Sequence, residues 1–414
     1  RSLYLAANMN FFAIVFAIAL VGGAVSSPAK PGRENGQGIK SMIRKANLDI
    51  VHQFLDHHKE PTSPRYELPD PSFTCDTSTG EEPTSVHALA PGDIDLIAAV
   101  GDSITTGFGI DAADLSEVQR PYRGKTFSTG GDGDIEGPDR AISLANILKR
   151  FNPNLRGVSH GIADIDDPNS GLNRAMPDSE SRDMLGQVQQ VITEIETNPD
   201  YDYENDWKLI VMYVGSQDLC YSCEDEPEPG TEFHYRDNIR AAIEWLKDEK
   251  EVPRLMLILI PVIDISHAPE YVNSEVCELI QAVSCPCLVD EEFFPQLPDL
   301  HQEYCRLIRE DARSGLWDTR DDFTVCYEPF TQDVLPGADE NGIIQDFVSH
   351  DCFHPSAVSH EVHSLMLWQN MLEPMGRKTH FGNPIEYLDE LLDMKCPTEE
   401  APYIYTNLNS GEIK

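Results

Sequence analysis

Three residues carry the side chains that a nucleophile, its base and an orienting acid require. Ser103 lies in the sequence Gly-Asp-Ser, and Asp351 precedes His354 by three positions. A serine hydroxyl is a weak nucleophile at its own pKa, so it needs a base within hydrogen-bond reach. An Asp three residues before a His can face the same point from one tight turn and hold the imidazole while it takes the serine proton. We therefore interpret Ser103 as a nucleophile, His354 as its base and Asp351 as the carboxylate that orients the base.

Each of these patterns is weak when it is taken alone. A Gly-Asp-Ser turn arises by chance in a chain of this length about one time in ten, and an isolated Asp-x-x-His is more often a helix-capping Asp beside a surface His. The Gly-x-Ser-x-Gly elbow of the α/β-hydrolases does not match, because Thr105 stands in place of the second glycine. His360 and His363 do not have the spacing of a His-Glu-x-x-His zinc site.

A third polar segment, Gly215 to Asp218, follows the apolar run at 209–214. The carboxamide of Gln217 could project toward the same crevice as Ser103 and donate a hydrogen bond to developing negative charge. Taken alone, however, the segment favours a simple turn in which Asp218 caps the residues that follow.

The apolar runs before these polar residues predict the elements that position them. Short, mostly apolar runs predict buried parallel strands at 94–100, 209–214, 254–260 and 323–327. Amphipathic patterns between them predict helices at 141–150, 184–196, 234–248, 298–313 and 356–372. Alternating strands and helices indicate an α/β fold whose parallel sheet is covered on both faces. Ligands bind beyond the carboxyl ends of the strands in such sheets, where Ser103 and Gln217 are expected.

The N-terminal part of the chain differs from the rest in composition. The apolar stretch at 11–21 is followed by small residues, which is typical of a secretory signal peptide cleaved after about Ser26. The stretch is too short for a membrane span of about 20 residues, so we expect no transmembrane anchor. The sequence predicts four parts: a signal peptide at 9–26, an N-terminal arm or propeptide at 27–70 with a short helix at 41–57, a globular domain at 71–400 and a polar C-terminal tail at 401–414.

Cysteine content and charge restrict the function classes further. Ten cysteines fit an oxidising, extracellular compartment in which an even number allows full pairing. Disulfides are favoured over zinc because Cys285 and Cys287 are too close for a zinc ribbon, but their connectivity stays open. The net charge of −40 repels phosphate backbones and anionic bilayers, which argues against nucleic-acid binding. No Asn-x-Ser/Thr acceptor for N-glycosylation is present.

The chain resembles the GDSL (SGNH) hydrolases, and in particular their phospholipase B-like branch. The resemblance extends from about residue 70 to residue 400 in matching order. It is carried by the segments 83–87, 93–105, 122–124, 130–133, 144–153, 206–208, 218–220, 285–287, 318–324, 351–354 and 368–374. It implies a three-layer α/β/α flavodoxin-like fold without a metal or other cofactor. It also implies hydrolysis of acyl esters of phospholipids, lysophospholipids or glycerides, with transient contact at a lipid surface.

The same resemblance assigns roles to individual residues and exposes two departures. Ser103, His354 and Asp351 match the family's nucleophile, base and acid, and the backbone N–H of Ser103 would also serve the oxyanion hole. The family places a glycine, a second oxyanion donor, where this chain has Asp178. The third donor is an asparagine in the family and Gln217 here, whose amide is displaced by one methylene in a site that tolerates little displacement.

Three functions follow from these observations. The leading prediction is a secreted, serine-dependent ester hydrolase of the phospholipase B or lipase type. Asp178 and Gln217 motivate the second, a lipid-binding protein of the same fold whose catalysis is weakened or lost. The third is an esterase of acetylated sugars, because one fold hosts several substrates.

Overall fold

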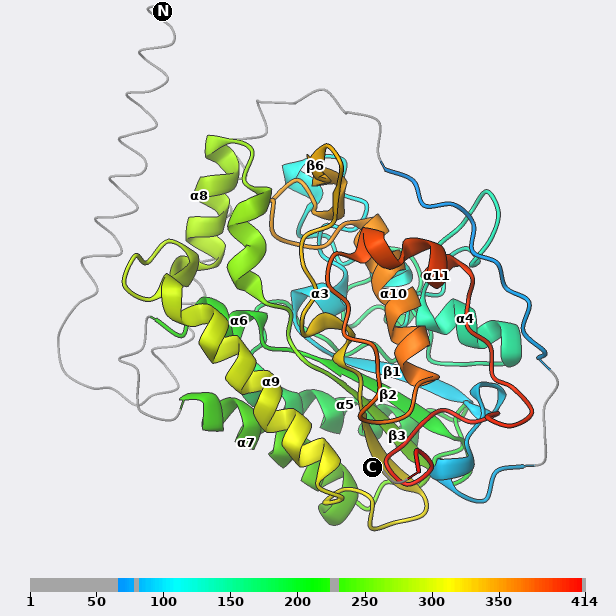
Figure 1. Cartoon of the computed structure of the whole chain (residues 1–414). Helices are drawn as coiled ribbons and strands as arrows, with labels where there is room; N and C mark the ends of the chain where they lie inside the picture. Colours follow the sequence, from blue (N-terminus) through cyan, green and yellow to red (C-terminus); the bar gives the residue numbers. More distant parts are fainter. Residues whose placement is uncertain (1–65, 78–81, 224–230, 412–414) are drawn as a thin grey trace, which may run out of the picture. The chain divides into compact units, whose positions relative to one another are not determined.

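The computed structural model describes residues 66–77, 82–223 and 231–411 (Figure 1). The predicted signal peptide at 9–26 and the short helix predicted at 41–57 lie outside these residues, as does nearly all of the predicted N-terminal arm.

A four-stranded sheet forms the centre of the described part. Its strands are β1 (Leu96–Gly101), β2 (Lys208–Tyr213), β3 (Leu255–Ile260) and β4 (Phe323–Tyr327). All neighbours are parallel and their spatial order follows the sequence, β1-β2-β3-β4. Every residue of the four strands is buried, which explains why the runs are continuously apolar instead of alternating. The four predicted strands are thereby confirmed to within two residues at each end.

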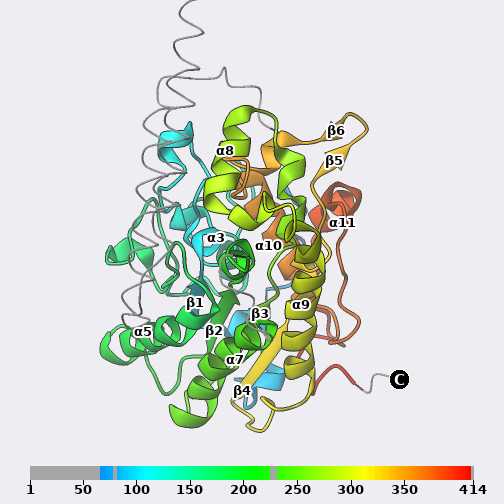
Figure 2. The ribbon, with the colours of Figure 1, turned by 90° about the vertical axis from the view of Figure 1, so that its left-hand side faces the viewer.

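Helices cover both faces of this sheet, as Figures 1 and 2 show. One buried core joins the sheet to α4 (Leu144–Phe151) and α10 (Ala357–Met371). The other joins it to α5 (Met184–Thr197), α7 (Thr231–Glu244) and α9 (Leu297–Arg313). The architecture is therefore the three-layer α/β/α arrangement that the sequence predicted.

The long helices follow the sequence closely, while several short elements were not predicted. Helix α4 begins after Ser143, whose hydroxyl accepts the N–H of Asn146 and so caps the first turn. Helix α7 continues into a π-helical turn at Trp245–Glu249. The further short elements are α3 (Ser103–Thr106), α6 (Ser216–Cys220), the 3₁₀ segment Ile265–Tyr271, α8 (Glu275–Ser284), β5 (Ala338–Asp339), β6 (Gly342–Ile343) and α11 (Leu388–Leu392).

Eight of the ten cysteines form disulfides, in agreement with the choice of disulfides over zinc. The pairs are Cys75–Cys396, Cys220–Cys285, Cys223–Cys287 and Cys277–Cys352. Cys305 and Cys326 remain free thiols in the core, so the full pairing that an even count allows is not reached. Burial raises the pKa of both thiols above its usual range, which makes them unreactive.

The two ends of the described chain pack beside each other. Ser72 exchanges backbone hydrogen bonds with Leu392 and Met394, next to the Cys75–Cys396 disulfide. Ile404 and Thr406, within the segment predicted as a polar tail, are fully buried. Within the ranges that the structure describes, no helix combines the length and apolarity needed to cross a bilayer.

Candidate active site

Ser103, His354 and Asp351 form a continuous chain of hydrogen bonds. The Oγ atom of Ser103 lies 2.9 Å from Nε2 of His354, and Nδ1 of the same ring lies 2.5 Å from Oδ2 of Asp351. Ser103 and Asp351 are each 3 % exposed. Residues that are 251 positions apart in sequence are thus brought into the arrangement in which an imidazole bridges a hydroxyl and a carboxylate.

The end of strand β1 sets the position of Ser103. Gly101 packs against β2 so closely that a Cβ atom would lie 2.1 Å from the carbonyl oxygen of Tyr213. Asp102 follows and caps α3 by accepting the N–H of Ile104. Ser103 is therefore the first residue of a helical turn at the carboxyl edge of the sheet, the position that the sequence predicted for it.

A short loop ahead of α10 presents His354 and Asp351. The second oxygen of the Asp351 carboxylate, Oδ1, accepts the backbone N–H groups of Phe353 and His354, which closes the loop on itself. Cys352 has a φ of 57°, a left-handed conformation that few non-glycine residues adopt. Its disulfide with Cys277 and the hydrogen bond from Gln281 to its carbonyl oxygen both anchor this loop to helix α8.

Charge and burial oppose each other at these groups. Burial alone would lower the pKa of His354, but the carboxylates of Asp351, Asp102 and Asp178 outweigh it and raise that pKa. Burial acts to raise the pKa of Asp351, but the charge and hydrogen bond of His354 outweigh it and lower that pKa. Asp351 is thereby kept ionised as the partner of the imidazole. At the cap of α3, burial raises the pKa of Asp102 to about 6.

The turn that contains Asp178 is held against the end of β1. Asp178 has a φ of 59°, the conformation that glycine adopts at little cost. Gln187 of α5 bonds both backbone groups of Gly101 and also donates to the hydroxyl of Ser179, with distances of 2.7, 3.0 and 3.0 Å. Sequence reasoning missed Gln187; its place on the buried face of an amphipathic helix was the available signal.

Asp218, in the short helix α6 that follows strand β2, joins the same assembly. Its carboxylate accepts the N–H and the hydroxyl of Ser181, at 2.9 and 2.6 Å. The expectation that Asp218 caps the residues after it is therefore wrong. Its carboxylate instead bonds Ser181, which lies shortly before α5. Burial raises the pKa of Asp218 to about 6.

Gln217 lies in the first turn of α6, two residues after Gly215. Its side chain is nearly buried, with 7 % exposure. The carboxamide makes no hydrogen bond with any residue that the structure describes. The neighbouring residue Asp218 bonds Ser181, so the turn that holds Gln217 is tied to the segment just after Asp178.

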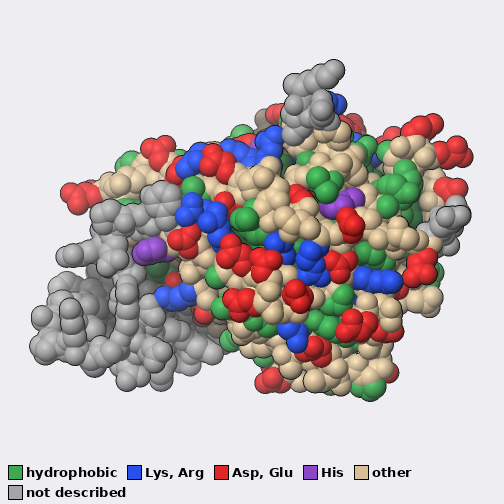
Figure 3. Space-filling model, turned by 90° about the horizontal axis from the view of Figure 1, so that it is seen from below, with side chains coloured by type: hydrophobic (Ala, Val, Ile, Leu, Met, Phe, Trp, Pro, Cys, Tyr) green, Lys and Arg blue, Asp and Glu red, His purple; other side chains and the backbone are tan. Residues whose placement is uncertain are grey.

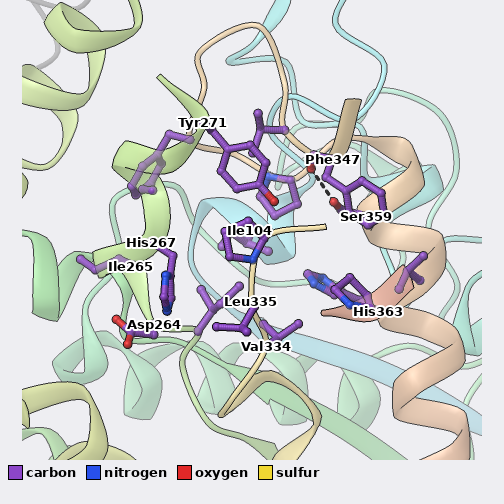
Figure 4. A pocket seen from close by; sticks show the side chains of 18 of the residues that line it. Ile104, Asp264, Ile265, His267, Tyr271, Val334, Leu335, Phe347, Ser359 and His363 are labelled. Atoms are coloured by element: carbon purple, nitrogen blue, oxygen red, sulfur yellow. Dashed lines mark hydrogen bonds between the residues drawn. The ribbon is translucent and has the colours of Figure 1, made fainter. Parts of the chain in front are cut away.

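An apolar pocket opens beside the Ser103–His354 pair. It is lined by Ile104, which follows Ser103, and by Phe353 and Pro355, which flank His354. The space between its walls is about 770 Å³, part of it open to solvent. Figure 4 shows the residues around it. Most are aliphatic or aromatic, among them Ile263, Ile265, Tyr271, Val334, Leu335, Phe347, Val362 and Met366.

The site offers its hydrogen-bonding groups without a metal centre. Within residues 66–77, 82–223 and 231–411, no group of three or more His, Cys, Asp or Glu side chains is arranged to hold a metal ion. Two phenylalanines instead border the imidazole, with the rings of Phe108 and Phe353 set edge-on to His354 at 5.8 and 5.4 Å.

Comparison with known proteins places this arrangement in a family. Residues 97–364, which include Ser103, Asp351 and His354, match the model of the GDSL-like lipase/acylhydrolase family. Membrane-associated phospholipase B1 of human is 34 % identical over 356 residues, and the mouse protein is 33 % identical over 362 residues. These alignments cover 84 % and 86 % of this chain, which spans about a quarter (24 %) of the length of each relative. The chain belongs to the GDSL-like lipase/acylhydrolase family.

Proposed function

We propose that the protein is a serine-dependent carboxylic ester hydrolase that cleaves acyl esters of phospholipids or related lipids. The observation that carries the proposal is the hydrogen-bonded chain of Ser103, His354 and Asp351, whose sequence neighbours line an apolar pocket. The relatives are named phospholipases, which favours phospholipids as the substrate class.

In the proposed reaction Ser103 attacks the ester carbonyl carbon while His354 removes its proton. The Oγ–Nε2 distance of 2.9 Å permits this transfer directly. The bond from Nδ1 to Asp351 fixes the tautomer that leaves Nε2 free to accept, and it stabilises the imidazolium. The imidazolium then gives the proton to the departing alcohol, which leaves an acyl group on Ser103. A water molecule activated by the same imidazole releases the acid.

We assign the oxyanion hole to the backbone N–H groups of Ser103 and Asp178 and to the carboxamide of Gln217. Ser103 directly follows β1, and Gln217 lies in the turn after β2. The segment of Asp178 is tied to both, because Gln187 bonds Gly101 and Ser179 and Asp218 bonds Ser181. We propose that Asp178 and Gln217 both weaken this oxyanion hole. The charge of Asp178 reaches His354 and so acts against a nearby oxyanion, and the longer arm of Gln217 moves its donor.

The second candidate, a lipid-binding protein that has lost efficient turnover, rests on these same two residues. Two assays separate the two candidates: covalent labelling by a fluorophosphonate probe, and turnover of a short-chain p-nitrophenyl ester. Ser103→Ala is the matched control in both. The hydrolase proposal predicts labelling of Ser103 and turnover well above the control. Equal signals from the wild-type protein and the control would refute it and leave lipid binding as the function.

The apolar lining of the pocket favours an acyl chain over an acetylated sugar. Aliphatic and aromatic walls gain free energy by removing a hydrocarbon chain from water, whereas a sugar needs many polar partners. Faster release of acetate from acetylated xylan than of fatty acid from a phospholipid would reverse this preference.

We also propose that the protein is secreted after removal of residues 9–26, with a hydrolase domain at 71–400 that follows an arm or propeptide. Four disulfides support an oxidising compartment. Expression of the chain in a secreting cell, followed by N-terminal sequencing of the protein in the medium, tests the cleavage. Retention of residues 9–26 would contradict it.

A further inference from the structure

One polar side chain in the wall of the apolar pocket has no assigned role. His363 lies on α10 between Val362 and Met366, which line the same pocket. Figure 4 shows its ring extending from the helix toward the pocket. The side chain is 91 % buried, since only 9 % of its surface is exposed.

The nitrogens of His363 make no hydrogen bond or ion pair with any residue in the described part of the chain. Its ring contacts are with Phe127, Phe330 and His360, at centroid distances of 6.1, 5.9 and 6.3 Å. None of these three contacts is a hydrogen bond. The imidazole therefore keeps its full hydrogen-bonding capacity for whatever occupies the pocket.

Three other polar side chains in the pocket wall already have partners. The Ser359 hydroxyl donates to the carbonyl oxygen of Phe347, and the Tyr271 hydroxyl accepts the N–H of Gly337. His267 pairs with Glu270. His363 differs from all three, because neither of its nitrogens has a hydrogen-bond partner among the described residues.

Burial also decides the protonation state of His363. Removal from water lowers its pKa to about 4, so the ring is neutral at physiological pH. A neutral imidazole has one N–H donor and one nitrogen acceptor. A plain hydrocarbon chain would leave both of them unpaired in an apolar pocket, which is unfavourable, whereas a hydroxyl group would satisfy either of them.

We propose that His363 makes this pocket selective for acyl chains that carry a hydroxyl group. The selectivity rests on the proposed function, because it describes the acyl group of the same ester substrate. His363 acts by binding the chain at a distance from the reacting carbonyl and takes no part in bond cleavage.

Binding to a catalytically silent protein tests the selectivity separately from hydrolysis. Calorimetric titration of Ser103→Ala with 1-monolaurin and with monolaurins hydroxylated at carbon 3, 6, 9 or 12 of the chain measures the preference. We expect one of these positions to bind about tenfold more tightly than the plain chain, the gain of one well-made hydrogen bond. Adding His363→Leu should abolish this gain while plain monolaurin binds at least as well. Met366→Leu, on the same wall, is the matched control and should keep it.

The outcomes separate the two proposals. Equal binding of all the monolaurins, or a preference that survives His363→Leu, would overturn the role of His363. If the preference is lost only in His363→Leu, the selective pocket is supported. If the wild-type protein in the same case shows no fluorophosphonate labelling, only the hydrolase proposal is refuted.

Discussion

Asp178 has a left-handed backbone conformation. Its side chain makes no hydrogen bond or ion pair with the described residues that would offset the strain. A non-glycine residue at a φ of 59° is strained, although Asp tolerates this region better than most residues. Its carboxylate adds negative charge close to His354. This charge acts against the proposed step in which negative charge forms on the substrate oxygen.

Asp178→Gly should therefore raise kcat on a p-nitrophenyl ester. Glycine relieves the backbone strain, keeps the N–H donor and removes the carboxylate that opposes the oxyanion. We expect an increase of roughly tenfold, less than the effect of a whole oxyanion donor. Asp178→Asn keeps the side-chain size without the charge, so it separates the electrostatic part. A lower kcat in both variants would show that the carboxylate assists the reaction.

Gln217→Asn tests the other altered donor. Shortening the side chain by one methylene brings the amide to the reach that an asparagine has, and a complete donor contributes roughly 10²–10³ in rate. Steady-state kinetics should show a higher kcat with little change in KM, because the donor acts on the transition state. Gln217→Ala serves as the control. An unchanged or reduced kcat in Gln217→Asn, with Gln217→Ala no worse than wild type, would remove Gln217 from the oxyanion hole.

The raised pKa of His354 predicts the pH dependence of the reaction. His354 accepts a proton only when it is neutral, so the rate should rise with pH through a midpoint above the ordinary His value of 6.5. Asp178→Gly removes one of the carboxylates that hold this pKa up, so it should shift the midpoint to lower pH. The measurement is kcat/KM against pH for both proteins. An acid limb centred below 6.5 would contradict the electrostatic account.

At the scale of elements, the strands and long helices could be predicted from sequence, whereas their tertiary partners could not. The runs at 209–214 and 255–260 are continuously apolar, as expected for strands that are buried on both faces of a parallel sheet. Helix α8 was missed because its ten residues form only a short amphipathic pattern. Its contact with the loop that presents His354 depends on the Cys277–Cys352 pairing, and sequence spacing does not determine connectivity.

The pocket was missed for a related reason. His363 was set aside because its spacing from His360 does not fit zinc, and no local pattern indicates that a helix residue faces a cavity. The wall is assembled from segments as far apart as Ile104 and Met366. The triad, by contrast, was predicted as a set of residue types at strand and helix ends, and the structure brings all three together.

Two disulfides should differ in what their removal does. The Cys277–Cys352 bond anchors the loop that presents His354, so the double serine variant should lose most of its kcat even where it remains folded. The Cys75–Cys396 bond joins two segments near the ends of the described residues and does not hold that loop, so its double serine variant should lose stability, by about 2–5 kcal/mol, and keep its kcat. Thermal unfolding and kinetics of both variants check this. An undiminished kcat in both variants would show that the loop keeps its position without the Cys277–Cys352 bond.

At the scale of the whole molecule, negative charge dominates. The 71 acidic residues outnumber the 31 Lys and Arg. On the face shown in Figure 3, Asp and Glu side chains are spread among the basic ones and do not form a single patch. A distributed field of this kind acts on an approaching lipid surface as a whole, and salt screens it.

Hydrolysis of phospholipid vesicles should therefore slow when anionic lipid is added to a zwitterionic bilayer. The repulsion should be large at about 0.01 M salt, where the Debye length is roughly 30 Å, and small near 0.15 M, where it is roughly 8 Å. Initial rates on phosphatidylcholine vesicles with and without phosphatidylserine measure the effect. A water-soluble uncharged ester is the control, and its hydrolysis should not respond to salt in this way. If anionic vesicles are cleaved faster at low salt, a local basic surface outweighs the net charge of −40 and guides the enzyme to the bilayer.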